Sequence, residues 1–258
     1  MAAGFYAPAP PATRIGWLAA GAVAVLLCMS TEARAFKLVP FKADFAPAGR
    51  GAQQLFRVVN DGPEPVAVQV RMTHRVMKVD GTEELPPADK DFVVYPQQLV
   101  VPAGGSRSVR VQYQGKAVLQ KETAYRIIAE QLPVELDKEK AASNQAGLRV
   151  MVRYLGAIYV VPPGVLSSVA VEKAGHAKGK DGKPQLEILV RNSGNAHTLL
   201  KDLVVEVKGP GAGGKGEATV RMEGTKLAKM VGENVLAQTL RRFVLPWPEE
   251  LAPGPVKV

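Results

Sequence analysis

Hydrophobic and polar residues alternate over short stretches of this chain, and turns rich in Gly, Pro, Asn and Asp separate the stretches. In residues 106–114, Val109, Val111 and Tyr113 fall on one side of an extended backbone, and mostly polar residues fall on the other. Helical periodicity is almost absent, and its best candidate, residues 228–243, is interrupted by Gly232. Strands at such short spacing predict an all-β fold of sandwich type.

The predicted strands form two series, and a proline-rich break lies between them. The first series covers residues 54–60, 65–77, 91–101, 106–114, 124–136 and 148–161. The break is "VPPGV" at 161–165, where two prolines followed by glycine cannot continue a hydrogen-bonded ladder. We therefore predict two β-sandwich domains, at 36–161 and 162–258. The chain ends at "GPVKV", where another strand would begin, so the second domain is expected to lack a final strand or the sequence to be truncated.

The last predicted strand of the first series, residues 148–161, is unusually long and apolar. Most strands have about 5–6 residues. Arg149 and Arg153 are the charged residues within this run. Its length raises the question of which strand it pairs with, and why it carries two arginines.

The N-terminal residues have the composition of a secretory signal peptide. Arg14 precedes an apolar stretch at 15–29, and Ala33-Arg34-Ala35 forms a small-residue cleavage site. A membrane anchor is the competing interpretation, but the stretch is shorter than the roughly 20 residues that span a bilayer. We predict cleavage after Ala35, with 1–35 as signal peptide, a periplasmic mature protein and no membrane insertion of the mature chain.

Cysteine content and charge narrow the possible functions. Cys28 is the single cysteine and lies in the predicted signal peptide, so a disulfide scaffold, a cysteine-ligated metal and a thiol nucleophile are excluded from the mature chain. The formal net charge of +9 favours anionic partners. Nucleic acid is not expected as a partner, because no basic helix and no strand pair with aromatic and basic residues is present.

Motifs that carry catalytic or cofactor chemistry are not found. "GPGAGGKG" at 209–216 has glycine where a phosphate loop needs Ser or Thr, and a strand pattern follows it, so a hairpin loop is predicted. His74, His176 and His197 have no partner at the spacing of a zinc site, and we interpret them as surface or core residues. We therefore predict no enzyme activity, no cofactor and no metal.

Three segments of the first domain carry a family resemblance. They are "DFVVYPQQLVVPAGGSRSVRV" (91–111), "ETAYRIIAEQLPVEL" (122–136) and "GLRVMVRYLGAIYVVPPG" (147–164). Their order and spacing resemble the periplasmic chaperones of the chaperone–usher pilus pathway, and "YRIIAEQLP" is most similar to the archaic, spore-coat-like branch. The resemblance covers about residues 36–165 well and the second domain in outline.

The resemblance implies two immunoglobulin-like domains in a boomerang arrangement. It also implies two kinds of partner: pilus subunits that lack a strand of their own sandwich, and an outer-membrane usher that receives them. Such a chaperone lends its long strand to the subunit, a form of strand addition. An exported two-domain adhesion or binding module that uses its loops is the alternative function.

The resemblance also assigns roles to individual residues. Leu148, Val150, Val152 and Tyr154 share one side of the long strand and are the expected donor residues. Completion of the protein's own core by the same side chains is the alternative. The family anchors the subunit's C-terminal carboxylate on two basic residues. Lys42 matches the first. Ala157 occupies the second position, so either Arg153 is the second anchor or the anchor lies elsewhere. A solvated strand face is the alternative for Lys42 and Arg153.

Overall fold

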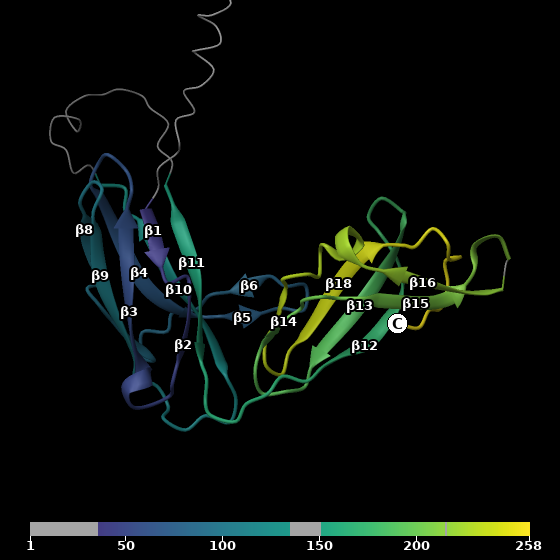
Figure 1. Cartoon of the computed structure of the whole chain (residues 1–258), viewed down its shortest axis with the longest axis horizontal. Coiled ribbons are helices and arrows are strands. Elements are labelled where there is room, and N and C mark those ends of the chain that lie inside the picture. Colours follow the sequence, from purple (N-terminus) through teal and green to yellow (C-terminus); the bar gives the residue numbers. More distant parts are fainter. Residues whose placement is uncertain (1–35, 135–150, 215) are drawn as a thin grey trace, which may run out of the picture. The chain divides into compact units, whose positions relative to one another are not determined.

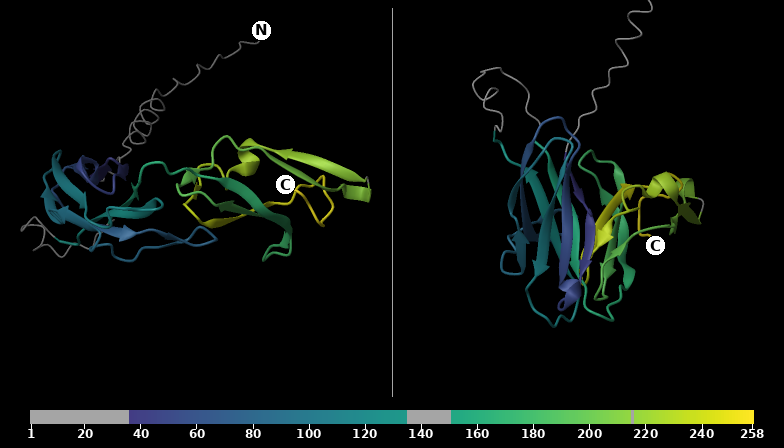
Figure 2. Two further views of the ribbon diagram at one scale, coloured as in Figure 1. Left: turned by 90° about the horizontal axis from the view of Figure 1, so that it is seen from below. Right: turned by 60° about the vertical axis from the view of Figure 1, so that its left-hand side comes forward.

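The computed structural model describes residues 36–134, 151–214 and 216–258. Apart from strands, its regular structure consists of three short 3-10 turns, η1 (Arg50–Ala52), η2 (Ala212–Gly214) and η3 (Gly224–Leu227). Figure 1 shows the strands gathered into two groups, β1–β11 and β12–β18. The two further views in Figure 2 show strands and short turns throughout the coloured part of the chain. The predicted all-β fold is confirmed.

The first group is a sandwich of two sheets. The four-stranded sheet has the order β1 (Phe36–Val39), β3 (Gln53–Asn60), β9 (Ser106–Tyr113) and β7 (Phe92–Tyr95). The five-stranded sheet has the order β2 (Lys42–Phe45), β11 (Arg153–Val160), β10 (Thr123–Gln131), β4 (Val66–His74) and β8 (Gln98–Val101). A small hairpin, β5 (Val76–Met77) with β6 (Glu83–Glu84), follows β4.

Alternating side chains from both sheets fill the space between them. In β9, Val109, Val111 and Tyr113 are buried and the residues between them are exposed, as the sequence pattern predicts. Aromatic rings join the two layers, and Phe92 stands edge-on to Tyr125 with ring centroids 4.9 Å apart. Burial of such side chains, worth about 1.5–3 kcal/mol each, holds the sandwich together without a disulfide.

The second group has its own core and three small sheets. They are β12 (Val169–Lys178), β13 (Pro184–Asn192) and β18 (Leu240–Pro246); β14 (Thr198–Leu199) with β17 (Asn234–Val235); and β15 (Val205–Pro210) with β16 (Glu217–Met222). Leu186, Ile188, Phe243 and Leu245 lie in the middle of its buried cluster. The predicted boundary between 161 and 162 falls in the connection from β11 to β12 and stays a prediction.

The structure shortens the long strand that the sequence suggests. β11 begins at Arg153, so Met151 and Val152 precede it, and residues 148–150 lie outside the described residues. The predicted signal peptide, 1–35, also lies outside them.

Two asparagines hold equivalent turns, one in each sandwich. Asn60 is buried, and its Nδ2 donates to the carbonyl oxygens of Glu64 (2.7 Å) and Pro102 (3.1 Å). Asn192 is buried too, and its Nδ2 donates to the carbonyl oxygens of Ala196 (2.8 Å) and Val235 (3.1 Å). In both turns, the asparagine Oδ1 accepts a hydrogen bond from the backbone N–H of the residue two positions later in the chain, at 3.0 Å. The two turns are therefore held by the same arrangement of asparagine hydrogen bonds.

We expect Asn192→Ala to lower the free energy of unfolding by about 2–3 kcal/mol, because it leaves several buried backbone groups without partners. Denaturant unfolding measures the change. Ser193→Ala, at an exposed neighbour, is the control and should stay within about 0.5 kcal/mol of the wild type. Equal stability of the two variants would show that the Asn192 hydrogen bonds contribute nothing.

Candidate functional site

One edge of the five-stranded sheet is only partly covered. β2 runs parallel to β11 and pairs with it from Lys42↔Ala157 to Phe45↔Val160. Before Ala157, β11 has β10 on one side and no strand on the other among the described residues. We call this stretch, residues 153–156, the open edge of β11.

Hydrogen-bond alternation shows where the backbone groups of the open edge point. The N–H groups of Ala157 and Val161 donate toward β2, to the carbonyl oxygens of Phe41 (2.9 Å) and Phe45 (2.8 Å). Residues two apart point the same way in a strand, so the N–H groups of Arg153 and Leu155 face the open edge. Unpaired strand groups of this kind are a template for pairing with another chain.

The first strands of the chain explain why the cover stops at Ala157. β1 pairs with β3 in one sheet and β2 pairs with β11 in the other, so the chain changes sheets at Pro40 and Phe41. A Cβ on Gly156 would lie 2.9 Å from the Phe41 carbonyl oxygen, so glycine allows this close approach. Residues of β11 before Gly156 are beyond the reach of β2.

Two of the four predicted donor residues lie within the described chain. Val152 and Tyr154 are half-buried and pack against the core of the first sandwich. The Tyr154 ring stands edge-on to Phe36 with centroids 5.2 Å apart. Leu148 and Val150 lie outside the described residues. The alternative role in the protein's own core thus holds in part for Val152 and Tyr154, and donation stays a prediction.

A row of side chains crosses the outer face of the same sheet. Lys42 pairs in register with Ala157, and Ala157 pairs with Arg126 of β10. Strands lie about 4.8 Å apart, so the backbones of Lys42 and Arg126 flank the methyl group of Ala157 across about 10 Å. The structure therefore places one basic residue on each side of a small one.

Arg153 lies away from this row. It pairs with Glu130, and its Nε is 3.4 Å from Glu130 Oε2. It precedes Ala157 by four residues, about 13 Å along a strand. Lys42 and Arg153 are thus not brought together, and Arg126 is the basic residue that sequence reasoning missed. The signal that would have found it is the pairing of "YRIIAEQ" with "RYLGAIYV", which places Arg126 opposite Ala157.

A partly buried ion cluster holds Arg126. Glu83 of the β5–β6 hairpin accepts from Arg126 Nε at 2.9 Å and from its NH2 at 2.8 Å. Arg75 NH2 lies 2.7 Å from the same carboxylate. Burial raises the pKa of Glu83, but the hydrogen bonds from Arg126 and Arg75 outweigh it and hold that pKa below its ordinary value. One carboxylate thus serves two guanidinium groups.

Tyr159 lies beside Lys42 and links it to this ion cluster. Lys42 Nζ is 5.2 Å from the centre of the Tyr159 ring, a cation–π geometry. The Tyr159 hydroxyl accepts hydrogen bonds from Arg75 NH1 at 3.1 Å and Asn234 Nδ2 at 2.6 Å. Burial raises the pKa of this hydroxyl, so it stays protonated at neutral pH.

Each of the three histidines lies against an aromatic ring. Ring centroids are 5.0 Å apart for His74 and Tyr125, 5.1 Å for His176 and Trp247, and 3.7 Å for His197 and Tyr159. His197 Nδ1 is also 2.7 Å from the buried carboxylate of Glu122. Within the described ranges, no group of three potential ligands could hold a metal ion.

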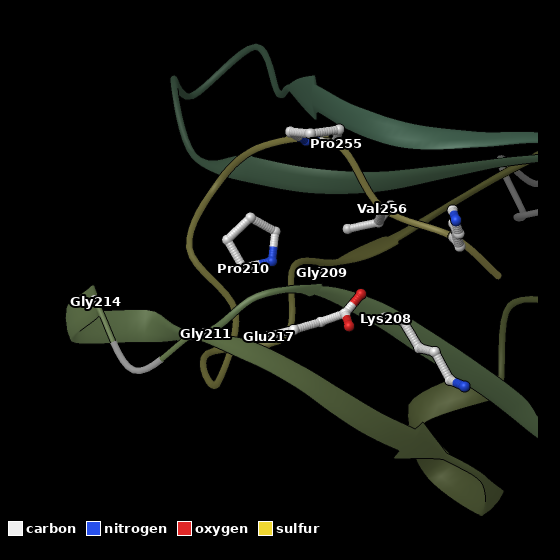
Figure 3. Close-up of a pocket in the computed structure, with 10 residues that line it drawn as sticks. Lys208, Gly209, Pro210, Gly211, Gly214, Glu217, Pro255 and Val256 are labelled. Carbon is white, nitrogen blue, oxygen red and sulfur yellow. The ribbon is translucent and has the colours of Figure 1, made fainter.

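A hollow in the second sandwich lies beside the turn from β15 to β16 (Figure 3). Glycines, Pro210, Pro255 and Val256 line it, together with the charged residues Lys208, Lys257 and Glu217. Pro210 pairs directly with Glu217, so "GPGAGGKG" is part of a hairpin, as predicted. A strand follows the loop, and the helix N-terminus that a phosphate loop needs is therefore not formed there.

In the described part of the chain no helix is long and apolar enough to cross a membrane.

Comparisons with known proteins agree with this architecture. Residues 47–165 match the family model of the "Pili and flagellar-assembly chaperone, PapD N-terminal domain". A search of the curated proteins found no match.

Solved structures of fimbrial chaperones have the same fold. The class 5 fimbriae chaperone CfaA has 18% identity and a TM-score of 0.51, over 86% of this chain and 98% of that one. A chain of the CsuC–CsuE chaperone–tip adhesion subunit complex, from archaic Csu pili of Acinetobacter baumannii, has 15% identity and a TM-score of 0.51, over 81% and 89%. The TM-score is the same for both, so the assignment to the archaic branch stays a prediction.

These findings confirm the two-domain immunoglobulin-like fold and the resemblance drawn from the sequence. The family and its structural neighbours are chaperones rather than enzymes. Residues 47–165 therefore form a PapD-type N-terminal domain of the kind found in pilus-assembly chaperones.

Proposed function

We propose that the chain is a periplasmic chaperone that binds incomplete pilus subunits by donor-strand complementation and delivers them to an outer-membrane usher. The open edge of β11 is the observation that carries the proposal. A subunit that lacks a strand exposes unpaired backbone groups and a hydrophobic groove. A strand lent by the chaperone satisfies the backbone and fills the groove with alternate side chains. The periplasmic location rests on the family and on the predicted cleavage after Ala35.

Groove filling is assigned to the residues that precede the open edge. Residues two apart share one side of an extended chain, so we assign Leu148 and Val150 to the side that Val152 and Tyr154 occupy. Val152 and Tyr154 are half-buried and pack against the edge of the first sandwich core. We propose Leu148 and Val150 as the main groove-filling residues, with Val152 and Tyr154 at the junction.

Val150→Asp is expected to abolish the complex with the cognate subunit, because a carboxylate in the groove loses its hydration without gaining a partner. Co-expression with the cognate subunit, followed by purification from periplasm, measures the yield of complex. Met151→Asp is the matched control, since its side chain points the other way and is 47% exposed. Undiminished complex with Val150→Asp would rule out donation by this side of the strand.

Anchoring of the subunit carboxylate is assigned to Lys42 and Arg126. They flank Ala157, whose methyl group leaves space for a carboxylate between them. Arg126 NH1 is not bound to Glu83 and lies 3.5 Å from the Leu155 carbonyl oxygen, on the side of β11. Arg153 remains the alternative second anchor, although it already contacts Glu130.

Arg126→Gln is expected to weaken subunit binding about 10–100-fold, the usual loss for a hydrogen bond to a charged group. Ala157→Lys in the Arg126→Gln background should restore much of the affinity, because it returns a cation to the same row. Arg153→Gln should have little effect. Affinities are measured by biolayer interferometry with purified subunit. A large loss with Arg153→Gln and none with Arg126→Gln would reverse the assignment.

Delivery to an usher needs a second surface, and the outer face of the four-stranded sheet offers one. Leu55 and Tyr95 lie in register on either side of Arg110, and their side chains are 62% and 74% exposed. Apolar side chains around a cation are typical of binding surfaces. This sheet lies opposite the one that carries the open edge, so both surfaces are accessible at once.

Leu55→Ser combined with Tyr95→Ser is expected to leave periplasmic chaperone–subunit complex unchanged but to reduce surface pili at least tenfold, as two exposed anchors are lost. Counts of pili by electron microscopy and the yield of complex are compared in the same cells. Val100→Ser, 50% exposed on the other sheet, is the control. Normal piliation of the double variant would place the usher contact elsewhere.

A further inference from the structure

Glu83 lies on a hairpin that is held in shape by its own turn. β5 and β6 pair through Val76↔Glu84 and Met77↔Glu83. The turn is closed by Lys78 N–H donating to the Thr82 carbonyl oxygen at 2.8 Å, and Asp80 accepts from Thr82 N–H at 3.0 Å. The Glu83 carboxylate therefore reaches the outer face of the five-stranded sheet from a fixed point.

The hydrogen bonds to Glu83 fix the orientation of the Arg126 guanidinium. Nε and NH2 of Arg126 bind the two carboxylate oxygens separately, at 2.9 and 2.8 Å. A two-point contact between planar groups sets the plane of both. NH1 is the nitrogen left over, and it faces β11, 3.5 Å from the Leu155 carbonyl oxygen.

The Glu83 carboxylate is also connected to the Lys42 side of the row, through Arg75 and Tyr159. Arg75 Nε donates to Glu83 Oε1 at 2.8 Å, and Arg75 NH1 donates to the Tyr159 hydroxyl at 3.1 Å. The Tyr159 ring in turn lies 5.2 Å from Lys42 Nζ. Arg75 and Arg126 side chains are 7% and 16% exposed, so neither moves without losing these contacts.

We propose that Glu83 is the positioning residue of the subunit-carboxylate site, aiming Arg126 NH1 at the space over Ala157 and holding the Tyr159 ring beside Lys42. The proposal rests on the function proposed above. Glu83 acts through the two arginines and does not itself touch the subunit. Glu83 binds Nε and NH2 of Arg126 and thereby leaves NH1 pointing outward.

The test uses N-acetylglycine as the carboxylate probe and N-acetylglycinamide as its uncharged counterpart. Nuclear magnetic resonance follows the Arg126 Nε–H signal and the backbone amides of Leu155 and Ala157 at pH 7. In the wild type, N-acetylglycine should shift these signals and the amide should not. In Glu83→Gln, affinity for N-acetylglycine should fall about tenfold.

Two controls separate positioning from stability. Glu84→Gln, on the same strand but exposed, should bind N-acetylglycine like the wild type. Should Glu83→Gln fail to fold, Glu83→Asp keeps the charge on a side chain too short to bridge both arginines, and a weaker binding constant with an unchanged melting temperature supports the proposal.

The outcomes distinguish this inference from the proposed function. Wild-type affinity for N-acetylglycine in a folded Glu83 variant would overturn the positioning role and leave the carboxylate site intact. A wild type that binds the acid no better than the amide would overturn the carboxylate site, and the positioning role with it.

Discussion

The change of sheet at Pro40 and Phe41 is the constraint on which the functional surface depends. Proline has no N–H to donate, so the ladder of β1 ends there and the chain crosses to the other sheet. β2 then pairs with β11 from Ala157 onward, and Gly156 permits the approach of the Phe41 carbonyl. The crossing thus covers one half of β11 and leaves the other half for another chain.

The basic row depends on a balance of charge beneath it. Buried guanidinium groups are costly unless each has a hydrogen-bonded counter-ion. Arg75 and Arg126 share Glu83, so the cluster keeps a net positive charge while its donors are mostly satisfied. That excess positive charge lies beside Lys42 and next to the open edge of β11. A chain that ends in a carboxylate can therefore form backbone hydrogen bonds with the edge and an ion pair with the basic row.

Sequence reasoning reached the fold more fully than the site. Alternation in 106–114 and the turn residues between strands were sufficient for an all-β sandwich, because burial on one face imposes a period of two. The hairpin at "GPGAGGKG" was also predicted in agreement with the structure. The missed element was Arg126, since its position beside Ala157 depends on the register between β10 and β11. Register depends on contacts distant in sequence, and spacing within one strand does not encode it.

Charge also explains how an open edge is tolerated. Unpaired edges invite self-association, and proteins limit it with charged side chains at the edge. Arg153 stands half-exposed at the start of the open edge, and Lys42 lies at its far end. Two copies that paired through this edge would bring like charges close together, which opposes the pairing. A strand that ends in a carboxylate meets no such repulsion. Arg153 therefore has a physical role at the edge whether or not it contacts a subunit carboxylate.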